Sequence, residues 1–215
     1  MLARQVSRMD NVVDKLDEAI KLYVTKLTCG SLDEREGRRA MEIISFSINL
    51  EHVGDIIDKN LTELAAKKIK RKLQFSDEGA HERAAFHDRI VRSFRMALAV
   101  FMSGDASDAH RLIGEKVKLR SAELAAAERR LERLRAGQPE TLETTSLHLD
   151  VLRDLKRIHS HICDTGEFSG WRKPDCQRAK ARPAINRSVD APNLIATIGS
   201  TGAVSLLNLN ELGAV

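Results

Sequence analysis

Residues 43–64 of the 215-residue chain, IISFSINLEHVGDIIDKNLTEL, carry the pattern that decides the fold. Their apolar side chains recur at steps of three and four, which places them along one face of an α-helix. Ser31 or Asp33 can cap the start of this helix, and the basic run 67–72, KKIKRK, suits the negative end of its dipole. We therefore expect one helix of about nine turns. The members of its apolar face are Ile43, Phe46, Leu50, Val53, Ile57, Leu61 and Leu64.

Four further stretches show the same spacing and predict helices. The first, over residues 2–28, carries Val6, Met9, Val13, Leu16, Ile20, Val24 and Leu27 and ends near Gly30. The third follows a turn with Ser76 as N-cap, carries Phe86, Ile90, Phe94, Leu98 and Phe101, and stops at Gly104. The fourth begins at Asp105 or Ser107, carries Leu112, Val117, Leu124, Leu131 and Leu134, and closes at Gly137. The fifth begins at Pro139 and carries Leu147, Leu149, Leu152, Leu155, Ile158 and Ile162.

Five long helices with short connections predict an all-α antiparallel bundle over residues 1–164. The composition agrees, because 31% charged and 4% aromatic residues are typical of long amphipathic helices rather than of sandwiches or barrels. Residues 165–215 contain most of the prolines, so we expect an irregular or disordered C-terminal tail.

Charge and cysteine content exclude several classes of protein. The net charge of +4 is too small to indicate nucleic-acid binding. The three cysteines form no CxxC motif, so neither a disulfide framework nor a zinc knuckle is indicated. No window approaches the roughly 18 apolar residues of a membrane span. We expect a cytoplasmic protein whose basic run 67–72 is solvated, or else contacts an anionic lipid or an acidic partner.

The chain contains an internal repeat. A shift of about 105 residues sets Leu50–Asp55 against Leu155–Ser160, and a similar shift sets the first helix on the fourth. We expect repeat one over residues 1–73 and repeat two over residues 77–164. Repeat two begins with the helix that starts near Asp77, for which repeat one has no counterpart, as if its first helix were missing.

Repeat one carries two pairs of acidic residues at a spacing of four, Asp10 with Asp14 and Glu51 with Asp55. Each pair puts two carboxylates on one helix face beside the apolar stripe, so antiparallel packing could bring all four together. Such a cluster needs protons or a cation, and hard oxygen ligands suit magnesium, manganese or iron. The alternative is a solvated or salt-bridged surface, since such pairs are frequent in a chain with 31 acidic residues.

Repeat two does not conserve these acids. Its matching positions are Lys116, Arg120, Lys156 and Ser160, which cannot ligate a hard cation. A basic residue there could pair with a nearby carboxylate in place of a metal. His159 and His161 point to different helix faces, which favours surface or core-edge positions over a ligand pair.

The segments ARQVSRMDNVVDKL at 3–16 and LEHVGDII at 50–57 resemble the PhoU family of helical phosphate-regulation proteins. The stretches NLEHVGDIIDKNL, FSDEG and LHLDVLRDLKRIHSHI are most similar to the cytoplasmic PhoU-like region of bacterial sodium/phosphate cotransporter proteins. The resemblance implies two three-helix bundles. It also implies metal ligation by Asp10, Asp14, Glu51 and Asp55, with iron, manganese, magnesium or zinc as the ion, and no metal in repeat two.

Three functional hypotheses follow. The first is a non-enzymatic module at the inner face of the plasma membrane that regulates phosphate transport by contacting a transporter membrane domain or a sensor kinase. In this hypothesis any membrane contact is made through the partner. The second is a metal-free structural module that forms a homodimer through exposed apolar surface. The third is a metal-dependent phosphate-ester hydrolase that uses the same carboxylates.

Overall fold

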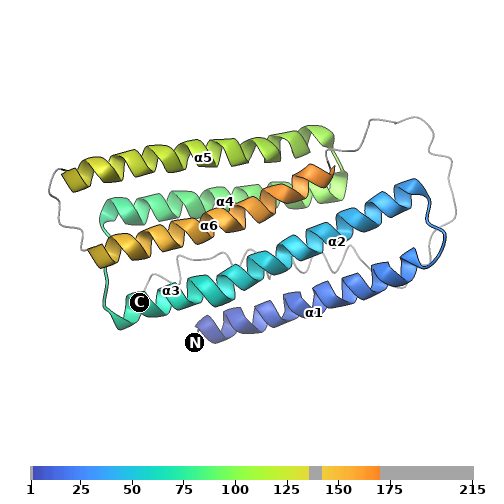
Figure 1. The fold of residues 1–215 in the computed structure, drawn as a ribbon, viewed down its shortest axis with the longest axis horizontal. Helices are drawn as coiled ribbons and strands as arrows, with labels where there is room; N and C mark the ends of the chain where they lie inside the picture. The colour runs from blue at the N-terminus through green and yellow to red at the C-terminus, as the bar shows by residue number, and fades with distance from the viewer. Residues whose placement is uncertain (1, 136–141, 170–215) are drawn as a thin grey trace.

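A computed structural model describes residues 2–135 and 142–169, and these form a bundle of long helices (Figure 1). The first rod is α1, Leu2–Thr28. The second rod is continuous through α2, Glu34–Asp55, a π-helical segment, Ile56–Leu61, and α3, Thr62–Lys70. The remaining rods are α4, Asp77–Ser103, α5, Ala106–Arg135, and α6, Leu142–Ser169. The predicted all-α bundle of five long helices is confirmed.

The helix boundaries follow from caps that the sequence indicates. Asp33 caps α2 in a reciprocal pair with Glu36, with N–O distances of 2.8 and 3.0 Å. Ser76 accepts a hydrogen bond from the backbone N–H of Gly79 at the start of α4. Gly104 ends α4 in the left-handed region at φ 66°, where an L side chain would be strained. Asp105 accepts the N–H of Ser107 at 2.7 Å and therefore caps α5.

Helix α6 lies at the centre of the bundle. It packs against α4 and α5 on one side and against α2 on the other, while α1 packs against α2 and the π-helical segment (Figure 1). Ile90 of α4, Leu112 of α5 and Ile158 of α6 are completely buried. The core is therefore continuous across both predicted repeats, and the α1–α2 hairpin is attached to it through α2.

The faces of α5 and α6 differ in part from the prediction. Val117, Leu124 and Leu131 of α5 are exposed, and so is Leu149 of α6. The inward face of α5 instead carries the small Ala109 and Ala126 together with Leu112 and Leu119. Small side chains occupy the interface because α5 packs closely against its neighbours, and a count of large apolar residues misses them.

Helix α6 continues to Ser169, beyond residue 164 where we expect the helical domain to end. Gly166 lies inside this helix, where an added Cβ would stand 3.1 Å from Leu112 Cδ2 and 3.3 Å from the Ala109 carbonyl. Gly166 therefore permits a close approach of α5 and α6. Gly137 and Pro139, and residues 170–215 of the predicted tail, lie outside the described residues.

A π-helical segment interrupts the second rod immediately after Asp55. Ile56, Ile57 and Leu61 of this segment are all buried, and the N–H of Thr62 donates to the carbonyl of Ile57. The wider turn changes the rotation of everything that follows relative to α2, and such segments are frequent at functional sites. Among the helices that the structure describes, none has the apolar length that crossing a membrane requires.

Candidate metal centre

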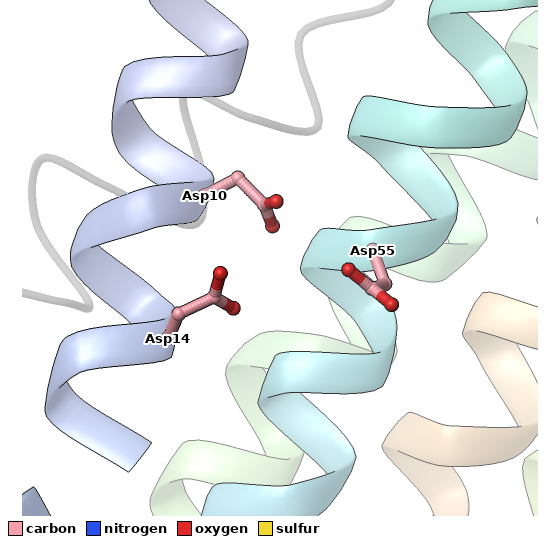
Figure 2. Close-up of side chains that lie close together, drawn as sticks. All are labelled: Asp10, Asp14 and Asp55. Carbon is pink, nitrogen blue, oxygen red and sulfur yellow. The ribbon is translucent and has the colours of Figure 1, made fainter. Parts of the chain in front are cut away.

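Three aspartates meet between α1 and the end of α2. Asp10 and Asp14 project from successive turns of α1 toward Asp55, the last residue of α2 (Figure 2). One carboxylate oxygen from each lies within 4.8 Å of the other two. We call these residues the aspartate triad. Asp10 is buried, Asp55 is half-buried and Asp14 is exposed, so the triad forms a site open on one side.

Asp10 is the buried member of the triad. It retains 5% of its accessible surface, and its Oδ1 accepts no hydrogen bond from the described residues. Burial raises the pKa of the Asp10 carboxyl to about 6, and the negative charges of Asp14, Asp58 and Asp55 act in the same direction. A buried, unpartnered carboxylate oxygen is costly unless a proton or a cation compensates it.

Gly54 makes this position of Asp10 sterically accessible. A Cβ at residue 54 would lie 2.6 Å from Asp10 Oδ1, well inside van der Waals contact. Because Gly54 has no side chain, α2 leaves at this position the space that the Asp10 carboxylate fills. The sequence alone gives no indication that this glycine, in the middle of a helix, serves the acidic site.

Lys59 is the cationic neighbour of the triad. Its Nζ lies 2.5 Å from Asp55 Oδ1, and its side chain is 64% exposed. The hydrogen bond to Asp55 raises the pKa of the Lys59 ammonium, with smaller contributions from the charges of Asp10 and Asp14. Sequence analysis missed both Lys59 and the nearby acid Asp58. Their spacing of three and four from Asp55 is a signal that could have found them.

The structure brings together three of the four predicted ligands. Glu51 lies one turn before Asp55, and its Oε2 is 2.7 Å from Nδ1 of His52. The His52 ring meets the ring of His161 from α6 edge-on, with 5.0 Å between centroids. Glu51 therefore belongs to the contact between α2 and α6, while Asp55 faces α1. The two acids of this pair serve different neighbours because each lies beside a different partner helix.

Repeat two holds ion pairs at the equivalent positions. Lys116 Nζ of α5 pairs with Asp164 of α6, and Lys156 Nζ lies 2.7 Å from Glu123 Oε2. These pairs agree with the prediction that a basic residue takes the role of a cation there. Arg120 and Ser160 are exposed.

His159 differs from the prediction of a surface or core-edge position, because it is almost completely buried. Its Nε2 shares a hydrogen bond with Ser93 Oγ at 3.0 Å, and Cys163 Sγ lies 3.7 Å from the ring. Burial lowers the pKa of this imidazole to about 4. The ring is therefore neutral at pH 7 and acts as a packed core residue.

The chemistry of the triad suits a hard cation. Carboxylate oxygens are the ligands that magnesium, manganese and iron accept, and an open side leaves room for water or a further ligand. Asp10 Oδ1 is buried and has no hydrogen-bond partner among the described residues, which is what a site for such an ion would look like without the ion. Asp10, Asp14 and Asp55 would hold the ion, and its positive charge would compensate the buried carboxylate of Asp10.

Fold and site together define a class: an all-α bundle in which one helical hairpin presents a cluster of three aspartates. The PhoU domain family matches residues 1–63, which contain the whole triad. This segment of the chain is similar to the PhoU domain, as the sequence motifs indicated. No solved structure matches the chain.

Two curated relatives carry the name "Putative inorganic phosphate export protein YjbB". The protein from Salmonella typhimurium strain LT2 is 34% identical over 172 residues, which is 80% of this chain. The protein from Escherichia coli K12 is 32% identical over the same length. The chain spans about a third of these relatives, 32% of their length. A match of 172 out of 215 residues extends beyond the PhoU segment and includes repeat two.

Proposed function

We propose that this chain is a non-enzymatic regulatory module of phosphate transport that binds a metal ion at the aspartate triad. The family match and the phosphate-export relatives support the role in phosphate homeostasis. The observation that carries the metal is Asp10, whose buried Oδ1 faces two further carboxylates without a hydrogen-bond donor among the described residues.

The proposed partner is the membrane domain of a sodium/phosphate cotransporter or a phosphate-sensing kinase. The relatives have about three times the length of the matched segment, which leaves room for other domains in them. A position at the cytoplasmic face of the plasma membrane follows from such a partner. Metal binding would then couple to transport by stabilising one arrangement of the α1–α2 hairpin.

Metal content tests the first half of this proposal. Chelator-treated protein is reloaded with iron, manganese, magnesium or zinc, and its metal is counted by plasma mass spectrometry. We expect about one or more ions per chain, lost in Asp14→Asn/Asp55→Asn and kept in the matched control Asp88→Asn/Asp150→Asn on α4 and α6. A concentration of one hundred times Kd should also stabilise the protein by about 2.7 kcal/mol. Equal metal in both double variants would refute the site.

Phosphate flux tests the second half. Cells that lack the gene are complemented with the parent sequence or with either double variant, and retention of radiolabelled phosphate is followed after transfer to phosphate-free medium. We expect the parent and the control variant to restore normal retention and Asp14→Asn/Asp55→Asn to fail. Normal retention without the gene would contradict a role in phosphate transport.

A metal-free dimerisation module is the alternative. The observation that favours it is the exposed row Val117, Leu124 and Leu131, which recurs every seven residues along α5. Light scattering of chelator-treated protein distinguishes the two proposals. A stable dimer that dissociates in Leu124→Lys, and whose melting temperature is unchanged in Asp55→Ala, would support this alternative.

A further inference from the structure

We propose that Lys59 is a tethered counter-cation of the aspartate triad: its ammonium neutralises Asp55 in the ion-free protein and leaves when a divalent cation binds. Lys59 would thereby set which ions enter the site and how tightly they are held. This inference rests on the metal site proposed above.

The position of Lys59 is the first support. Its Nζ contacts Asp55 Oδ1 at 2.5 Å, and its charge also interacts favourably with Asp10 and Asp14. An ammonium so close to a triad oxygen occupies space and lone pairs that a metal ion would need. The two cations also repel each other, so binding of one favours departure of the other.

The freedom of the lysine side chain is the second support. Lys59 is 64% exposed, so its ammonium can exchange the carboxylate for water without moving the helix. The backbone around it is held by Ile56, Ile57 and Leu61, which the core buries almost completely. Release of the ammonium is therefore a side-chain rotation and needs no local unfolding of the π-helical segment.

The internal repeat is the third support. The shift that superposes the repeats sets Lys59 on Asp164 and Asp10 on Lys116. In repeat two these two positions form the ion pair between Lys116 and Asp164, with the signs of the charges exchanged. The fold therefore brings position 59 and position 10 of the repeat unit within reach of one another. In repeat two Lys116 and Asp164 neutralise each other. In repeat one the three carboxylates of the triad lie near Lys59.

A tethered ammonium gives the site a preference among ions. A monovalent cation gains no more attraction from the triad than the lysine that it must replace, and the lysine is always present. A divalent cation interacts with each carboxylate about twice as strongly, so it can displace Lys59. We therefore expect Lys59 to exclude monovalent ions and to weaken the binding of divalent ions by a moderate factor.

Calorimetric titration with Mn²⁺ at fixed ionic strength tests the proposal on the chelator-treated full chain. Lys59→Met removes the ammonium and keeps the length of the side chain. Lys67→Met is the matched control, because Lys67 makes an exposed pair with Glu63 at the same spacing and 2.8 Å, and its loss changes the net charge equally. Lys59→Arg restores the positive charge, and circular dichroism checks that each variant is folded.

We expect Lys59→Met to bind Mn²⁺ about three to ten times more tightly than the parent, since a surface ion pair no longer competes. Lys67→Met and Lys59→Arg should bind like the parent. Lys59→Met should also gain binding of Na⁺, seen as a stronger loss of Mn²⁺ affinity when NaCl replaces a bulky organic salt.

The outcomes separate this inference from the metal site itself. Equal affinity of Lys59→Met and the parent would overturn the role of Lys59 and leave the metal site intact. Binding by Lys59→Met alone would show that Lys59 blocks the site, and would overturn both metal binding by the native chain and the displacement of Lys59 by an ion. Absence of binding in every variant would overturn both.

Discussion

Replacement of Gly54 by alanine tests the close approach on which the site depends. The added Cβ would lie 2.6 Å from Asp10 Oδ1, so the carboxylate must rotate away or α1 must move. Rotation would take Asp10 out of the triad. Gly54→Ala is therefore expected to weaken cation binding although it changes neither a charge nor a ligand.

The effect of Gly54→Ala on stability combines two opposing contributions. Alanine in a helix interior is favoured over glycine by about 1 kcal/mol. Overpacking of a buried contact costs about 1–3 kcal/mol. The net expectation is a loss of about 0–2 kcal/mol in the free energy of unfolding. Gly37→Ala is the matched control on the same helix, since its Cβ would meet nothing within 4 Å, and it should stabilise by about 0.5–1 kcal/mol.

Urea denaturation of chelator-treated protein measures both variants, and Mn²⁺ titration measures their affinity. The reasoning requires Gly54→Ala to be less stable than Gly37→Ala by about 1–3 kcal/mol and to bind the ion more weakly. If both variants gained stability equally and both bound Mn²⁺ like the parent, Asp10 would not be packed against α2 as described.

Three further predictions concern the buried polar groups of the two repeats. The pKa of Asp10 is raised in the folded protein, so its protonation favours folding: the contribution of Asp10 to the stability of ion-free protein should grow as the pH falls from 7 toward 4, opposite to that of buried His159. Asp10→Asn should therefore be more stable than the parent at pH 7, and this advantage should shrink toward pH 4 in urea titrations. Lys116→Met removes the half-buried partner of Asp164 and should lower the free energy of unfolding by about 1 kcal/mol, with the loss reduced in Lys116→Met/Asp164→Leu. Ser93→Ala removes the hydrogen bond to buried His159 and should cost about 1–2 kcal/mol in chemical denaturation, whereas an unchanged midpoint would show that this bond is dispensable.

The two repeats compensate the charges at equivalent positions in different ways. In repeat one the three carboxylates of the triad lie beside the ammonium of Lys59, and the proposed cation would compensate the remaining negative charge. In repeat two Lys116 pairs with Asp164 and Lys156 pairs with Glu123, so basic side chains of the protein itself compensate these acids. Repeat two thus has ion pairs within the protein where repeat one has the aspartate triad.

The helices and their ends could be predicted because their causes are local. The spacing of apolar residues determines helix periodicity, and residues such as Asp33, Ser76 and Gly104 act on backbone groups within one turn. The pairing of Asp10 with Asp14 on one face is local in the same sense. The extent of α5 could be predicted, but not all of its buried face. The buried residues of α5 include alanines whose role depends on the neighbouring helices.

The composition of the site was decided by tertiary structure. Which acid of α2 faces α1 depends on the rotation of one helix about the other, and this rotation is set by packing contacts such as that of Asp10 over Gly54. Glu51 instead lies beside His52, whose ring meets His161 of α6, whereas the pair of Asp55 with Lys59 is local along one rod. The sequence by itself therefore determined the helices, their caps and the acidic spacing along each one. Only the packed bundle determined which of these charges meet, because contacts between helices depend on distances that no periodicity within a single helix specifies.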